Sequence, residues 1–112
     1  MRLTFLAVFI LVVFASCARP TMPVASPGDV ERATERWPDV TSAKLEEGRT
    51  LYVARCSGCH QPVAPTSIPT HEWAGHITEM RERANLTDDE AALIERYVVT
   101  MSEASSPDHN AR

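Results

Sequence analysis

Residues 56–60 read Cys-Ser-Gly-Cys-His, which places two thiols and an imidazole at the spacing that attaches a c-type haem. Thiols three positions apart lie about one helical turn from each other, so both can bond to the two vinyl groups of one porphyrin. The next residue then directs its imidazole at the iron. The sequence therefore predicts Cys56 and Cys59 as the covalent anchors of one haem c, and His60 as an axial ligand of its iron.

The spacing of these residues also fits two other kinds of site. A redox disulfide between Cys56 and Cys59 normally follows a buried strand, and no strand-like run precedes the motif. A zinc site is the second alternative, with spacings of 2, 11 and 4 across Cys56, Cys59, His71 and His76. A zinc finger needs a hairpin around its cysteines, and the prolines within 61–69 leave no paired strand there. The haem interpretation is favoured over both.

The N-terminus has the pattern of an export signal. A basic residue, Arg2, precedes an almost wholly apolar run from Leu3 to Ala15. A run of about 13 residues is shorter than the roughly 20 that a membrane-spanning helix needs. Residues 1–16 are therefore predicted to be a signal peptide, and export agrees with the haem motif because c-type haems are attached outside the cytoplasm.

Residues 14–17 resemble a bacterial lipobox, with Phe14 where leucine is usual. This resemblance implies that Cys17 is lipidated and becomes the new N-terminus, which would anchor the protein to a membrane facing the periplasm. Cleavage after Ala18 is the alternative, and it would leave a soluble periplasmic protein that begins at Arg19.

The mature chain divides by composition into three parts. Residues 17–40 are predicted to be a lipidated, proline-rich tether, not core, that ends in a short polar helix over 29–36. Residues 41–102 carry the helical patterning, and 103–112 are predicted to be a disordered tail. A domain of about 62 residues is marginal on its own apolar burial, so we expect the haem to serve as part of its core.

Three helices are expected in this domain, with no strand. The first spans 41–56, with Thr41 or Ser42 as its cap. The second runs from His71 to about Arg83 with Thr70 as its cap, after an extended loop that follows the haem. The third follows the capping box Thr87-Asp88-Asp89-Glu90 and is expected to bury Ala91, Leu93, Ile94, Tyr97, Val98 and Met101.

About 55% of the chain resembles a small class I cytochrome c domain. Gly48 and Tyr52 stand eight and four residues before the first haem cysteine, as in that family, and Ile94 and Tyr97 match the family's apolar–x–x–aromatic pair. The resemblance implies an all-α bundle of three main helices around a covalent haem, whose first and last helices cross at the glycine. A missing Cβ lets the two backbones touch there.

The sixth ligand of the iron is predicted to be Met80, because a methionine thioether raises the reduction potential of an electron-transfer haem. Met80 shares a helix face with Trp73 and Ile77, which we expect to face the haem. The alternative axial ligands lie nearby or later in the chain: His76, His71 and Met101.

The net charge of the chain limits the kinds of partner that it can bind. Loss of Arg2 with the signal changes the count from 11 basic and 15 acidic residues to 10 and 15, a net charge of −5, which excludes nucleic acid as a partner. Lys44 is the one lysine, so redox partners should present a basic or apolar surface. Arg55, Arg81 and Arg83 are candidate partners of the haem propionates, with at least two of them expected on solvated helix faces.

These observations lead to the hypothesis of a periplasmic monohaem c-type cytochrome that carries one electron at a time between redox proteins and catalyses no bond-making. The alternative is a haem enzyme or a gas or redox sensor with an open sixth coordination site.

Overall fold

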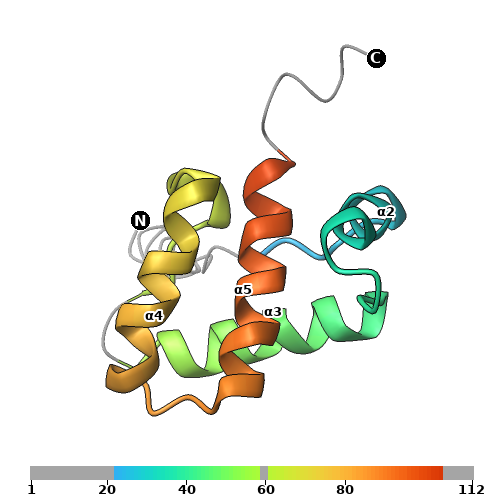
Figure 1. Cartoon of the computed structure of the whole chain (residues 1–112). Helices are drawn as coiled ribbons and strands as arrows, with labels where there is room; N and C mark the ends of the chain where they lie inside the picture. Colours follow the sequence, from blue (N-terminus) through green and yellow to red (C-terminus); the bar gives the residue numbers. More distant parts are fainter. Residues whose placement is uncertain (1–21, 59–60, 105–112) are drawn as a thin grey trace, which may run out of the picture.

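The computed structural model describes residues 22–58 and 61–104, and these ranges contain helices and no strand. The helices are α2 (Pro27–Arg36), α3 (Ser42–Cys56), α4 (Trp73–Arg83) and α5 (Asp88–Glu103). Helix α4 runs beside α5, α3 crosses beneath them, and α2 lies on the other side of α5 (Figure 1). The expected all-α bundle is confirmed. The additional helix α2 begins two residues earlier than the polar helix predicted over 29–36.

The crossing of α3 and α5 is the densest part of the fold. A Cβ added at Gly48 would collide with the backbone carbonyl of Leu93 and would lie 3.0 Å from the Cβ of Tyr97. The Tyr52 ring lies 6.3 Å from the Tyr97 ring, centroid to centroid. The predicted contact between the glycine–aromatic pair of the first helix and the last helix is therefore present. Leu93, expected to be buried, is only half-buried and contributes its backbone to this contact.

Local capping explains where two of the helices begin. Thr41 Oγ1 accepts a hydrogen bond from the Lys44 backbone N–H and starts α3. At α5 the Thr87 hydroxyl accepts from Glu90 N–H, while the Glu90 carboxylate accepts from Thr87 N–H. Both predicted caps are confirmed, because the short side chains of threonine satisfy N–H groups that the first helical turn leaves without partners.

We call residues 22–40 the N-terminal strap. The polar helix predicted over 29–36 is present there as α2, but the prediction that the residues before it form a tether outside the core is wrong from Met22 onward. Met22 is 4% exposed and belongs to the same apolar cluster as Tyr97. The Met22 carbonyl accepts a hydrogen bond from Arg49 Nη1, and the Pro23 carbonyl accepts one from the Tyr97 hydroxyl at 2.7 Å. Helix α2 follows, and Arg32 Nη2 donates to the Thr100 carbonyl of α5. The strap is thus part of the folded domain.

The segment between the haem motif and α4 also differs from the prediction. It contains two short 3₁₀ turns, Pro65–Ser67 and Thr70–Glu72, and α4 begins only at Trp73. Thr70 does not cap α4; its hydroxyl instead lies 2.9 Å from the Ser102 hydroxyl of α5. The Thr70 hydroxyl therefore makes a tertiary hydrogen bond with α5 instead of the local capping bond that the sequence predicts.

Several predictions fall on residues outside the described ranges. These are the signal peptide, Cys17, Cys59, His60 and the tail after Ala104. Within 22–58 and 61–104, no helix is both long and apolar enough to cross a membrane.

Candidate haem site

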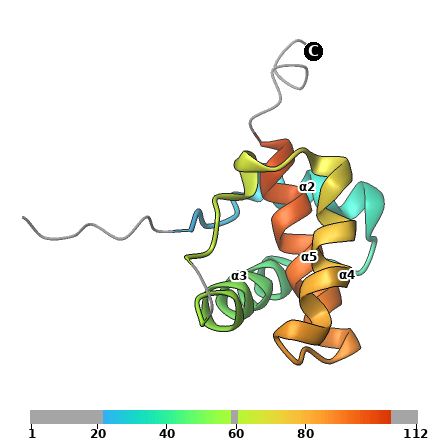
Figure 2. The same cartoon turned by 90° about the vertical axis from the view of Figure 1, so that its left-hand side faces the viewer.

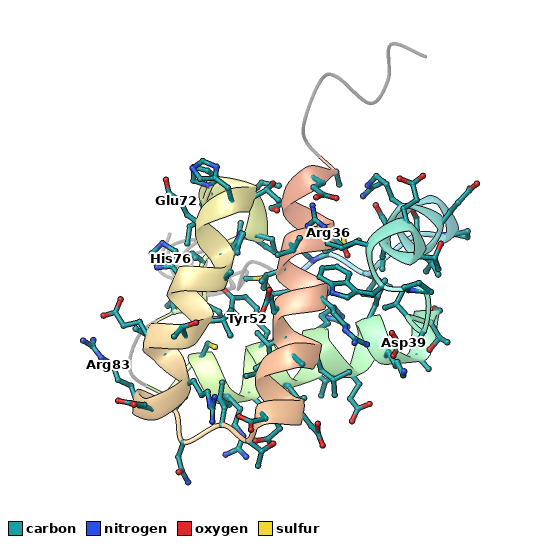
Figure 3. All side chains as sticks on the ribbon, in the orientation of Figure 1. Arg36, Asp39, Tyr52, Glu72, His76 and Arg83 are labelled. Atoms are coloured by element: carbon teal, nitrogen blue, oxygen red, sulfur yellow. The ribbon has the colours of Figure 1, made fainter. Side chains whose placement is uncertain are left out.

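An apolar cavity of about 330 Å³ lies between the C-terminal end of α3, the loop after the haem motif, and α4. Tyr52 lies between α4 and α5, while His76 and Arg83 extend from the side of α4 away from α5 (Figure 3). This volume falls within the range of cofactor and ligand sites. The lining residues are Tyr52, Arg55, Cys56, Val63, Ile68, Trp73, His76, Ile77, Met80, Arg83, Ala84 and Leu86.

Cys56, the first cysteine of the motif, ends α3 and lies in the cavity wall. Its thiol is half-buried, and burial raises its pKa. A raised pKa lowers the thiolate fraction, which is the opposite of what a redox-active cysteine needs. The position and the chemistry of this thiol therefore favour an anchoring role over the redox disulfide. Cys59 and His60 lie outside the described residues, so their roles stay predictions.

Helix α4 brings two of the candidate axial ligands to the same cavity. Met80 and His76 both line it, one helical turn apart, and both are half-buried. The other two candidates lie elsewhere: His71 is 83% exposed beside Glu72, and Met101 is buried in the apolar cluster around α5. The structure thus places Met80 and His76 with Cys56, and His71 and Met101 outside the cavity lining.

Two aromatic side chains hold the loop against the helices. The Tyr52 hydroxyl donates a hydrogen bond to the Val63 carbonyl at 2.8 Å, and Trp73 Nε1 donates to the Pro65 carbonyl at 3.0 Å. The two rings meet edge to face, with centroids 6.0 Å apart. Burial raises the pKa of Tyr52 far above its usual value, so its hydroxyl remains a donor. Helix periodicity predicts that Tyr52 and Trp73 lie in the core, but it does not predict their hydrogen bonds to the loop.

Two arginines contribute the charge at the cavity wall. Arg55 from α3 and Arg83 from α4 line it, and no carboxylate does. Each also has an exposed ion-pair partner, Glu90 at 2.8 Å for Arg55 and Glu79 at 3.0 Å for Arg83. The third predicted arginine, Arg81, pairs with Asp88 and lies outside the lining.

The residues of the cavity fit a haem. A haem presents a flat apolar macrocycle, two propionate carboxylates and an iron that takes axial ligands. The apolar wall suits the macrocycle, Arg55 and Arg83 suit the propionates, and Met80 or His76 suits the iron. Cys56 would hold one edge through a thioether. The described residues therefore suit the macrocycle, the propionates and one axial position of this cofactor, while Cys59 and His60 lie outside the described ranges.

A second cavity, of about 410 Å³, lies between α2 and the end of α5. Its wall is charged, with Arg36 paired to Glu103 at 3.1 Å and stacked over Trp37. None of the predicted site residues lines it. Across 22–58 and 61–104, no three histidine, cysteine or acidic side chains gather as a metal site.

The chain resembles one known c-type cytochrome at low identity. It is 25% identical over 69 residues to the cytochrome c-type protein TorY of Haemophilus influenzae, an alignment that covers 62% of this chain. The chain spans only 19% of the length of that protein. No protein-family model matches the chain, and no solved structure matches it. The similarity agrees with the haem interpretation of the motif and the cavity.

Proposed function

We propose that this chain is a monohaem c-type cytochrome that carries single electrons between redox proteins. Exported to a bacterial periplasm, it would be anchored to a membrane by lipid on Cys17. One observation carries the proposal: Cys56 of the haem motif shares an apolar cavity with Met80, His76 and two arginines. The similarity to a c-type cytochrome protein supports it independently.

The side chains around the cavity have separable tasks in this function. The haem iron, when bound, would accept and release one electron. Ile77, Trp73 and Leu86 exclude water from its surroundings, which favours the less charged reduced state. Arg55 and Arg83 would offset the charge of the propionates. The hydrogen bonds from Tyr52 and Trp73 fix the loop, so little structure has to rearrange when the charge changes.

Absorption spectroscopy of the exported protein tests the proposal. Protein made with cytochrome maturation machinery should show a Soret band, and its pyridine haemochrome should indicate two thioether bonds. The pigment should stay with the protein in acidified acetone. A colourless protein, or one that releases its pigment, would refute the proposal.

Substitution of the two ligand candidates on α4 identifies the sixth ligand. We expect Met80→Ala to convert the low-spin, six-coordinate spectrum to a high-spin one and to lower the reduction potential, because the thioether favours reduced iron. His76→Ala serves as the matched control, since it removes a cavity side chain one turn away. The opposite pattern would assign the ligand to His76.

Binding of carbon monoxide distinguishes an electron carrier from a haem enzyme or sensor with an open sixth coordination site. An enzyme or sensor with an open sixth site should bind it readily in the reduced state, whereas a methionine-ligated carrier should bind it slowly or not at all. Rapid binding to the unaltered protein would favour the alternative.

A further inference from the structure

The N-terminal strap shortens the distance between the candidate lipid anchor and the folded domain. An extended tether over residues 17–28, before the predicted polar helix, would have a contour length of roughly 40 Å at about 3.5 Å per residue. Met22 is buried in the core instead, and only five peptide units separate Cys17 from Met22. Their largest possible span is about 18 Å.

The start of the strap is fixed to both helices of the crossing. Arg49 of α3 donates to the Met22 carbonyl at 3.3 Å, and Tyr97 of α5 donates to the Pro23 carbonyl at 2.7 Å. The Tyr97 side chain is fully buried. The strap therefore cannot lengthen the tether without breaking two partly buried hydrogen bonds and removing Met22 from the core, which costs several kcal/mol.

The surface next to this point suits a bilayer. Val24 is 65% exposed, the most exposed of the large apolar side chains described. Residues 17–28 contain one arginine and no acidic residue, although the mature chain has a net charge of −5. An acidic protein approaches anionic lipid at least cost with an uncharged, apolar part of its surface.

We propose that the surface around Pro23 and Val24 lies against the lipid headgroups, with the domain held within about 18 Å of the membrane. This inference rests on the lipid anchor of the proposed function. The lipid supplies the affinity, and the strap fixes distance and orientation. The domain would then reach redox partners only at the membrane surface and could not exchange electrons with partners deep in the periplasm.

Fluorescence quenching in vesicles tests the contact. In the lipidated holoprotein, an engineered cysteine is the one free thiol if Cys17, Cys56 and Cys59 form thioethers. Val24→Cys carries an environment-sensitive fluorophore, and the vesicles contain phosphatidylethanolamine, phosphatidylglycerol and a headgroup-labelled quencher lipid. Glu82→Cys is the control, because Glu82 is exposed in the last turn of α4. That end of α4 lies away from the start of the strap in both views (Figures 1 and 2). We expect at least threefold stronger quenching at position 24.

A second variant tests whether the short tether is what holds position 24 close to the membrane. An insertion of 16 glycine and serine residues between Thr21 and Met22 should remove the difference between the two positions while the protein still sediments with the vesicles. Equal quenching at positions 24 and 82 in the original protein, or no effect of the insertion, would overturn the inference. Protein that stays in the supernatant would overturn it together with the lipid anchor, whereas a retained Soret band would leave the electron-carrier proposal standing.

Discussion

The α3–α5 crossing and the wall that α4 forms over the cavity are built on different amounts of buried surface. Helix α5 buries eight residues, among them Ile94, Tyr97 and Val98, whereas α4 buries only Trp73 and Ile77. The crossing packs protein on protein, but the inner face of α4 borders a cavity of about 330 Å³. The crossing can form from the chain alone, while the stability of the wall depends on what fills the cavity.

The largest expected effect comes from removing the haem anchors. The double variant Cys56→Ala and Cys59→Ala should yield colourless protein with a much lower and broader thermal transition, because the α4 wall loses the cofactor that fills the cavity while the crossing can still form. Circular dichroism measures the transition, and hydrogen exchange should show that α4 loses protection before α5. A haem-free chain with a melting temperature near that of the holoprotein would contradict this dependence.

Gly48→Ala should damage the crossing most among single substitutions. The new Cβ meets the Leu93 backbone, which cannot move aside as a side chain could, so we expect a loss of about 2–3 kcal/mol in the free energy of unfolding. Gly75→Ala on α4 is the matched control, since no atom lies within 4 Å of its added Cβ. It should stabilise the protein by about 0.5–1 kcal/mol, because alanine loses less backbone entropy in a helix. Denaturant unfolding of the holoprotein measures both, and equal effects would refute the contrast.

Trp73→Phe tests how much the hydrogen bond from α4 to the loop stabilises the cavity wall. It removes the donor to the Pro65 carbonyl and should cost about 1–3 kcal/mol, since that carbonyl accepts its bond at a buried site. Tyr52→Phe removes a comparable bond to Val63 at a partly buried site and should cost less. Unfolding curves and exchange rates of the loop amides distinguish the two. A larger effect at Tyr52 would reverse the order of importance.

Acid should weaken the N-terminal strap. Burial opposes ionisation of Asp29, but hydrogen bonds from Ser26 and Arg32 prevail and lower its pKa, while Lys44 and Arg96 lower the pKa of Asp39 to about 2. A carboxyl group with a lowered folded-state pKa stabilises the protein above its unfolded pKa of about 3.8, and this contribution is lost as pH falls through the folded value.

The melting temperature should therefore fall between about pH 4 and pH 2, and Asp29→Asn should flatten that slope. Thermal unfolding followed by far-ultraviolet circular dichroism measures the slope in both proteins. An unchanged slope in Asp29→Asn would show that other groups control acid stability.

The features that were predicted correctly from the sequence depend on residues that lie close together in the chain. The Thr87–Glu90 capping box joins residues three apart, and the position of Gly48 relative to Tyr52 and Cys56 is set by helix periodicity. The cavity was also predicted in part, because Cys56 and Met80 were both expected to face the haem. Ligation by Cys59 and His60, which lie outside the described residues, stays a prediction.

The strap and the start of α4 could not be predicted in this way. The bonds to Met22 and Pro23 come from donors 27 and 74 positions away, and proline-rich composition alone resembles a linker. Thr70 had the composition of a cap, but its nearest hydroxyl partner is Ser102 of α5. Short-range patterns carry no information about such partners, so composition led to the wrong prediction at both places.

The bond between Tyr97 and the Pro23 carbonyl also sets an order of assembly. In the export that we propose, the N-terminal end would emerge first, so Pro23 would be free long before its donor Tyr97 arrives. The crossing and the bond that fixes the strap would form only after α5 has emerged, because both need residues of α5.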